Sequence, residues 1–325
     1  MYATRLLSMY KRNPSALSDP PPSGPNSGYL VILDEEAQTY TCFGSIKDDR
    51  IVDFPFPQNK NLTIDDSGRD SGLREEVMFL PVLNQPLSSN RYYVIRRNGK
   101  NQGQANTSSR EENMSTCLCC IFVDDVKPTP LEPFKFNDYQ QFKIFKKRYG
   151  FQAKSIALDG VPPGILRVNK DWRVYARTPN NYNLSQALGS NDSLRFQLPD
   201  FNFRLSTNQS ESVIVGKWYC PFMFVKERIK IKEQMKLSMF YELTLEQRWE
   251  KIFSKENSGE SNVLVDVVIQ TEVAKVEGRG AIWDENRLVD GVLWFKTVED
   301  VGEETSVGLC LEVVEGMKWE QQRFG

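Results

Sequence analysis

Short apolar runs separated by polar breaks recur along most of the chain, and the breaks are rich in Gly, Asn, Ser and Pro. Runs of about four to eight residues with β-branched and aromatic side chains, bounded by turn residues, are typical of β-strands. In the N-terminal portion this pattern predicts strands at 29–36, 39–44, 77–82, 91–97 and 116–126. Short strands at such spacing indicate a β-sandwich or a barrel-like domain.

The C-terminal portion has the same texture. Strands are predicted at 172–179, 213–225, 262–278 and 291–298, and at the start of 306–325. The run at 213–225 contains Gly216, and a glycine inside a strand marks a bulge or a break between two strands.

Helical signals are few. Thr244 offers an N-cap with Gln247 three residues later, which is typical of a capping box. The apolar side chains that follow fall on one helical face, namely Leu245, Trp249, Ile252 and Phe253. We therefore expect a helix at 244–253 and a second, short one at 183–189, whereas 229–243 fits a helix and a strand equally. The predicted class is α+β, predominantly β: an N-terminal β-sandwich or barrel-like domain, then a β-rich domain with one or two helices.

Prolines set the predicted domain limits. Residues 1–28 contain clustered prolines, which favour extended polyproline II and predict an arm. Residues 127–134 hold three prolines in eight positions, as linkers between domains do. We expect an N-terminal β domain at 29–130 and a C-terminal α+β domain at 131–325.

The densest group of aromatic side chains lies between 217 and 253: Trp218, Tyr219, Phe222, Phe224, Phe240, Tyr241, Trp249 and Phe253. Aromatic side chains bury the largest areas and dominate cores. This segment is therefore expected to form the core of the C-terminal fold and not an active site.

Composition excludes several functions. The chain has 41 basic and 43 acidic residues, a net charge of −2, so it lacks the positive field that holds nucleic acid. It contains no histidine, which excludes Ser-His-Asp and Cys-His catalysis and every metal site with a histidine ligand. No catalytic residue and no cofactor is predicted.

The sequence also bears on location. No apolar run approaches the roughly 20 residues that a membrane-spanning helix needs. The first residues lack the apolar core and cleavage pattern of a secretory signal. We expect a cytoplasmic protein, with the nucleus as the alternative.

Three thiols within four residues, Cys117, Cys119 and Cys120, are the candidate metal ligands, with Cys42 or Cys220 as a fourth. Zinc sites favour a Cys-x2-4-Cys spacing in a turn, whereas a strand sends neighbouring thiols to opposite faces. Buried strand cysteines are the simpler interpretation.

The polar stretch Asp66–Gly72 reads DSGRDSG, similar to phosphorylation-dependent degradation signals. Ser67 and Ser71 are the candidate phosphosites, since phosphates there would suit a reader lined with arginine. The same residues are also typical of a turn-rich loop with no regulatory role. The carboxylate doublets at 34–36, 48–49, 65–66 and 124–125 are expected to be solvated acids, because adjacency in sequence is no evidence of an acid/base pair.

Several long motifs carry a resemblance to a known family. They are GPNSGYLVI (24–32), LPVLNQPLSSNRYYVIRR (80–97), GKWYCPFMFVKE (216–227) and QMKLSMFYELTLEQRWEKIF (234–253). With them the chain resembles a land-plant family known only as the domain of unknown function numbered twelve-sixty-two. The resemblance implies a plant protein that responds to defence or stress signals, and it offers no catalytic residues. Some members carry a crystal-toxin-like label.

Three functions follow. The first is a non-enzymatic interaction module in stress or defence responses, with an unidentified protein partner and an open oligomeric state. The second is an enzyme or small-ligand binder that uses carboxylates or thiols in a pocket between the domains. The third is a toxin-like, membrane-active protein.

Overall fold

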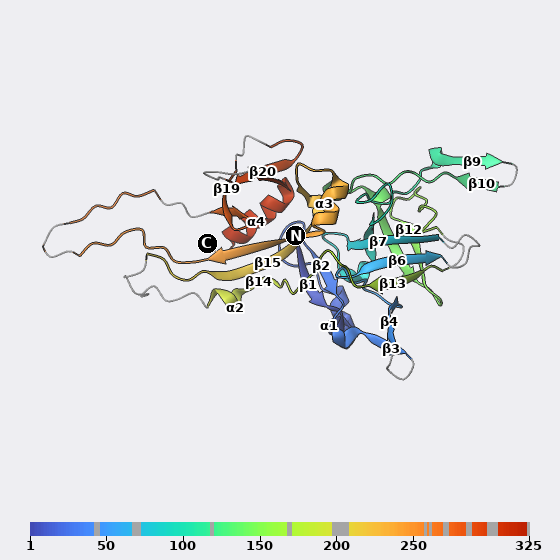
Figure 1. The fold of residues 1–325 in the computed structure, drawn as a ribbon, viewed down its shortest axis with the longest axis horizontal. Coiled ribbons are helices and arrows are strands. Elements are labelled where there is room, and N and C mark those ends of the chain that lie inside the picture. The colour runs from blue at the N-terminus through green and yellow to red at the C-terminus, as the bar shows by residue number, and fades with distance from the viewer. Residues whose placement is uncertain are drawn as a thin grey trace.

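The computed structural model describes the chain except for residues 42–45, 67–72, 118–119, 168–170, 197–207, 257–258, 260–261, 269–272, 284–287, 298–304 and 324–325. Figure 1 shows an elongated molecule with three sheets in its body and several thin projections. Most of the chain in regular structure is strand, so the fold is α+β and predominantly β, as the sequence predicts.

The largest sheet has seven antiparallel strands in the order β12-β11-β8-β7-β6-β13-β5. Their bounds are β5 (Arg50–Ile51), β6 (Asn61–Asp66), β7 (Leu73–Pro81), β8 (Arg91–Arg96), β11 (Gln141–Lys146), β12 (Phe151–Ser155) and β13 (Arg173–Arg177). Rings on one face stack against each other, with Phe79 between Phe56 and Trp172 at centroid distances of 4.3 and 6.0 Å. Strands from both sides of residue 130 build this sheet, because β11 pairs with β8 and β13 with β6.

The central sheet runs in the order β14-β15-β1-β2, with β17 also paired to β15. Its bounds are β1 (Tyr2–Leu6), β2 (Gly28–Ile32), β14 (Gly189–Ser190), β15 (Val213–Pro221) and β17 (Phe240–Gln247). Where the sequence predicts an extended arm, the structure has β1, parallel to β2 and antiparallel to β15. Tyr2 and Ala3 are fully buried, and the prolines follow later: Pro14 begins a 3-10 helix, Pro25 lies in a turn, and the three between them lie in chain without regular structure.

The third sheet has the order β16-β21-β20-β19-β18 and packs against the C-terminal helix α4. Its bounds are β16 (Val225–Lys226), β18 (Ala274–Val276), β19 (Arg279–Trp283), β20 (Val292–Thr297), β21 (Ser306–Cys310) and α4 (Leu311–Gln322). Of the strand predicted at 262–278, β18 is the described part that pairs.

Two small hairpins project from the body in Figure 1, β3 (Thr39–Thr41) with β4 (Ile46–Asp48) and β9 (Met114–Cys117) with β10 (Cys120–Val123). The remaining α-helices are short: α1 (Leu7–Arg12), α2 (Asp192–Arg195) and α3 (Ile231–Leu237). The 3-10 helices are Pro14–Ser18, Glu35–Ala37, Leu87–Ser89, Glu111–Asn113, Pro133–Lys135, Asp138–Gln140 and Phe222–Phe224.

The helix predicted at 244–253 is wrong. Residues up to Gln247 belong to β17, which pairs with β15 from Phe240↔Pro221 to Gln247↔Val213. Leu243 and Leu245 alternate with exposed residues and pack on the core, so tertiary pairing overrides the helical spacing. The open segment 229–243 contains both α3 and the start of β17. The helix predicted at 183–189 is wrong as well, since 182–188 has no regular structure.

Gly216 sits at a bulge, as predicted: the register of β15 against β17 shifts between Ile214 and Gly216. A Cβ at Gly216 would lie 2.2 Å from the Trp218 ring, so only glycine lets this ring fold back over its own strand.

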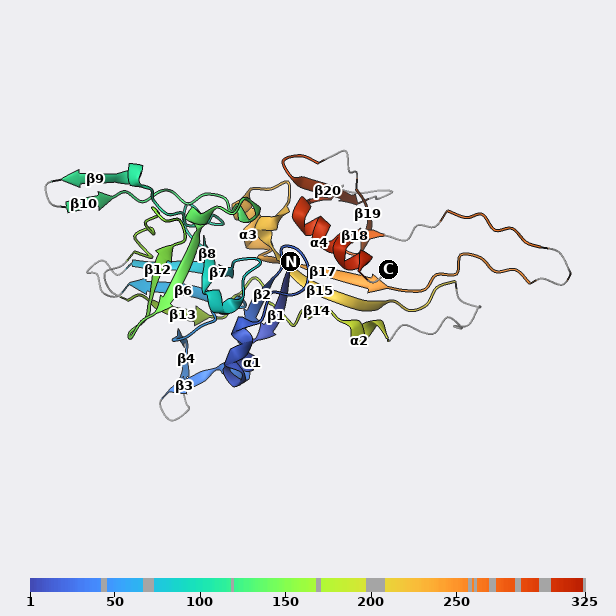
Figure 2. The same ribbon diagram turned by 180° about the vertical axis from the view of Figure 1, so that it is seen from behind.

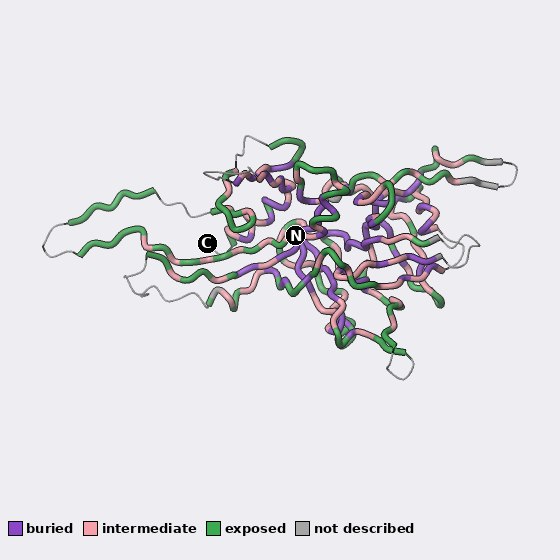
Figure 3. Tube along the Cα trace, viewed as in Figure 1, coloured by how far each residue is buried: buried purple, intermediate pink, exposed green. Residues whose placement is uncertain are grey.

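One hydrophobic core joins the sheets. It contains residues of β1, β2, β7, β8, β15, β20, α3 and α4. Figure 3 shows that buried residues gather in the body and that the projections are largely exposed. Trp218, Tyr219, Phe222 and Phe224 are buried in the core, so this part of the aromatic segment forms core, as the sequence predicts. Phe253, at the far end of that segment, is exposed.

Candidate interaction surface

The β15–β17 ladder continues past the ends of both strands. An isolated bridge joins Gln209 to Glu250, and Ser210 N donates to Trp249 O at 2.9 Å. Lys251 N donates to Asn208 O at 2.8 Å.

We call the described residues 252–256 and 262–268 the distal excursion, with an outgoing arm and a return arm. Figures 1 and 2 show it reaching far beyond the ends of β15 and β17, away from the body. In the described part of the chain neither arm belongs to a helix or strand, and neither makes a backbone–backbone hydrogen bond. The excursion therefore presents bare peptide donors and acceptors along its length.

The side chains of the excursion are unusually apolar for exposed chain. The exposed large apolar residues are Ile252, Phe253, Val263, Leu264, Val265, Val267 and Val268. Leu264 is 95% and Val268 103% exposed, so these two side chains touch almost nothing. Single exposed apolar residues are ordinary, but a contiguous run of them marks an interaction surface.

The return arm has apolar side chains at both odd and even positions. In extended chain, successive side chains point to opposite faces. Val263, Val265 and Val267 then share one face, while Leu264, Asp266 and Val268 share the other. An arm with apolar groups on both faces is typical of a strand that is covered on both sides.

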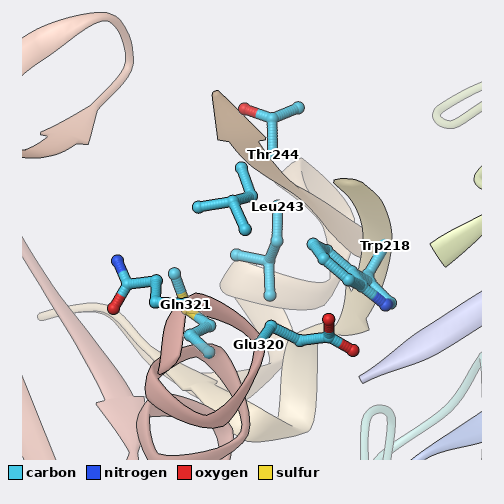
Figure 4. A pocket seen from close by; sticks show the side chains of 7 residues that line it. Trp218, Leu243, Thr244, Glu320 and Gln321 are labelled. Carbon is cyan, nitrogen blue, oxygen red and sulfur yellow. The ribbon is translucent and has the colours of Figure 1, made fainter. Parts of the chain in front are cut away.

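A small pocket lies between α4 and the β15–β17 pair (Figure 4). Trp218, Leu243 and Leu245 line it from the strands, and Met317 and Glu320 line it from the helix. The Glu320 carboxylate is buried and accepts a hydrogen bond from the Ser190 hydroxyl. The free volume of about 10 Å³ is room for a single water, so the pocket is a packing feature.

A wider polar depression lies on the face of the seven-stranded sheet opposite its aromatic core. Its lining residues are Asp49, Thr63, Asp65, Arg74, Glu76, Asn98, Tyr175 and Arg177. Asp65 accepts from Arg74 at 3.1 Å, which neutralises its charge. The depression is thus a mixed, water-facing surface that contains members of two of the carboxylate doublets.

The other doublets have structural partners. Asp34 Oδ1 accepts from the backbone N–H of Ser8 at 3.0 Å, at the start of α1. Asp125 accepts from Gly164 N at 2.8 Å and pairs with Arg167 at 3.3 Å. These carboxylates stabilise loops and a helix end.

The candidate metal ligands lie mostly outside the described residues. The backbones of Cys117 and Cys120 face each other across the β9–β10 pair, but their side chains, and all of Cys119 and Cys42, are not described. Among described residues no group of three potential ligands is close enough to hold a metal ion. The CLCC metal site stays a prediction, and so do the phosphosites Ser67 and Ser71, which lie outside the described residues.

Two cysteines are described fully, and both carry shielded thiols. Burial raises the pKa of Cys220 to about 12 and that of Cys310 to about 11. The charge of Glu312 raises the Cys310 value further. Both thiols are therefore protonated and poorly nucleophilic near neutral pH.

The helices of the described residues are too short or too polar to cross a membrane.

The sequence did not identify the distal excursion. The sequence predicts a strand over 262–278, and the β-branched composition of 262–268 does fit a strand. Among the described residues the run has no strand beside it, and a single sequence carries no signal for that. The polar residues 254–261, which precede the run, were the available hint that it projects.

These features define a β-rich α+β protein with a projecting apolar excursion. A family model described as "Protein of unknown function (DUF1262)" matches residues 23–121, which supports the resemblance stated above over that segment. Among solved structures, the chain is similar to the one titled "Crystal structure of Cry35Ab1", with a TM-score of 0.40 and 13% identity over 60% of this chain. The chain spans 55% of that structure's length. No curated protein matches.

Proposed function

We propose that this protein is a non-enzymatic interaction module that binds a polypeptide partner through its distal excursion. The observation that carries this proposal is the return arm, where bare backbone and apolar side chains occur together over residues 262–268. A partner strand that pairs with this arm would satisfy its peptide groups and cover its valines in one step. This mode of recognition is β-strand addition.

The alternative of an enzyme or small-ligand binder has less support. It requires a pocket between the two halves of the chain into which acids or thiols converge. The region where the sheets meet is filled by the shared core of Tyr2, Tyr93, Trp218 and Phe222. The one buried thiol described there, Cys220, has its pKa raised by burial.

A membrane-active role is the second candidate, because the same apolar side chains could contact lipid. Hydrocarbon offers no partner to bare peptide groups, and each unsatisfied group costs several kcal/mol there. A polypeptide strand supplies both the hydrogen bonds and the apolar cover. The observations therefore favour a polypeptide over a bilayer.

The setting we propose follows from the family resemblance. We place the module in stress or defence responses of a plant, in the cytoplasm or nucleus. Induction of its transcript and protein by stress or defence signals, and fractionation of treated tissue, test this setting.

The binding proposal is tested by affinity capture from stressed plant tissue with quantitative mass spectrometry. The bait is the full chain, its Val265→Asp variant, or the matched control Val52→Asp. Val52 is also an exposed valine outside regular structure, but it follows β5 of the seven-stranded sheet and is not part of the β15–β17 ladder. We expect the polypeptides captured by wild type to persist with Val52→Asp and to fall at least tenfold with Val265→Asp.

The same three proteins are tested for co-sedimentation with phosphatidylcholine vesicles. A set of captured polypeptides that is unchanged by Val265→Asp would overturn the proposal. Binding to vesicles that is lost only in Val265→Asp, without any loss of captured polypeptides, would favour the membrane candidate instead.

A further inference from the structure

We infer that the occupant of the distal excursion is a second copy of this chain, and that the two return arms pair antiparallel about a two-fold axis at Val265. The inference rests on the proposed function, since it names the partner of the same surface. It starts from the seven residues 262–268, NVLVDVV, which are exposed and without backbone partners in the described chain.

The composition of this segment favours pairing with itself. It has five β-branched or leucine side chains, a single charge at Asp266, and no proline or glycine. Segments of six or seven residues with high β-propensity and low net charge are those that pair with identical copies. A two-fold interface also uses each favourable contact twice.

Charge decides between parallel and antiparallel pairing. A parallel, in-register pair would set Asp266 directly opposite Asp266 of the second copy. Like charges directly opposite each other destabilise a strand pair. An antiparallel pair avoids this in every register except the one centred on Asp266.

The faces of the arm decide the register. Only registers centred on a residue keep Val263, Val265 and Val267 of both copies on one face, because side chains alternate. Centring on Val265 pairs all seven residues, so that Val263 lies opposite Val267 and Leu264 opposite Asp266. Centring on Leu264 pairs only residues 262–266. The register centred on Val265 therefore forms a six-valine face with the most pairs.

The size of the contact sets its strength. Stable interfaces bury about 1,600 Å² in total, and seven residue pairs bury less than that. The dimer is accordingly of the weak, reversible class. It should be populated at high protein concentration and trapped by a covalent link.

Cysteine trapping tests the register. At Val265→Cys the two new thiols face each other across the axis, and mild oxidation should give a disulfide-linked dimer in excess of the wild-type background. Val267→Cys is the matched control, because its two thiols would lie four residues apart along the pair, about 13 Å. That distance exceeds the reach of a disulfide. A mixture of the Val263→Cys and Val267→Cys proteins should cross-link to each other.

Sedimentation velocity tests the association without oxidation. The weight-average sedimentation coefficient of wild type should rise with concentration, and that of Val265→Asp should not. The inference is overturned if Val265→Cys gives no more dimer than wild type, or if Val267→Cys cross-links equally well. It is overturned too if a dimer forms only with phosphatidylcholine vesicles present. If these tests fail while Val265→Asp still loses captured polypeptides, the proposed function stands and the second copy does not.

Discussion

Gln58 and Val31 hold each other by two hydrogen bonds. Gln58 N donates to Val31 O at 2.8 Å, and Val31 N donates to Gln58 Oε1 at 2.6 Å. The Gln58 side-chain Nε2 donates to the carbonyl oxygens of Phe56 and Phe79 at 2.7 and 2.8 Å. Gln58, which is 1% exposed, thus forms hydrogen bonds both to β2 of the central sheet and to β7 of the seven-stranded sheet, as a strand between them would.

Gln58→Met should destabilise the fold. Methionine keeps most of the volume but leaves the buried Val31 N–H without an acceptor, and such a group costs about 1–3 kcal/mol. Urea unfolding followed by tryptophan fluorescence measures the loss. Gln209→Met, at an exposed position, is the control and should change stability by less than about 0.5 kcal/mol. Equal stability of both variants would mean that the hydrogen bonds of the Gln58 side chain contribute nothing to the free energy of unfolding.

Gly216→Ala should destabilise the fold through a clash. The added Cβ would lie 2.2 Å from the Trp218 ring, and overpacking of this kind costs about 1–3 kcal/mol. Gly280→Ala in β19 is the control, because a Cβ there meets nothing within 4 Å. Thermal unfolding compares the two. A Gly216→Ala protein as stable as Gly280→Ala would show that Trp218 can move aside.

Gly216 shows what the sequence predicts well. The bulge at Gly216 and strands such as β8 follow from local composition. A run of β-branched and aromatic residues predicts a strand, and a glycine inside such a run predicts a bulge, without knowledge of the partner strand. The overall class follows for the same reason.

Other elements depend on partners far along the chain. β1 was not predicted, because Tyr2 pairs with Gly28 on one side and with Tyr219 on the other. The helix predicted from Thr244 is wrong because residues up to Gln247 pair with β15 as a strand. The distal excursion is the converse case: its return arm is strand-like in composition, but the described chain supplies no strand beside it.

The thiols of Cys220 and Cys310 should react slowly while the protein is folded. Their pKa values, raised by burial to about 12 and about 11, reduce the thiolate fraction about tenfold for each unit above the ordinary value. Iodoacetamide at pH 8 should therefore modify both at least about 100-fold more slowly than in urea. Peptide mass spectrometry measures the two rates, and fast labelling of Cys220 in the native protein would contradict its burial.

The raised pKa of Cys220 also makes the stability of the fold decrease at alkaline pH. The unfolded thiol loses its proton near the ordinary cysteine pKa of 9.0, whereas burial raises the pKa of folded Cys220 to about 12. The folded state then binds more protons, so the free energy of unfolding falls as pH rises from 9 towards 12. Cys220→Ala should lower stability at pH 7 through its cavity but flatten this decline. An unchanged slope between pH 9 and 11 would assign the decline to other groups.

Leu264→Lys should leave stability unchanged and reduce the binding of a hydrophobic dye. Leu264 is 95% exposed on the return arm, so a charged replacement loses no packing in the isolated chain, and the free energy of unfolding should move by less than about 0.5 kcal/mol. The measurement is made at submicromolar protein, where association through the arm is negligible, with dye fluorescence and urea unfolding on the same samples. Leu288→Lys, at another exposed leucine, should leave the dye signal nearly unchanged. If Leu264→Lys costs more than about 1 kcal/mol at this concentration, the arm packs against its own chain and is not available to a partner.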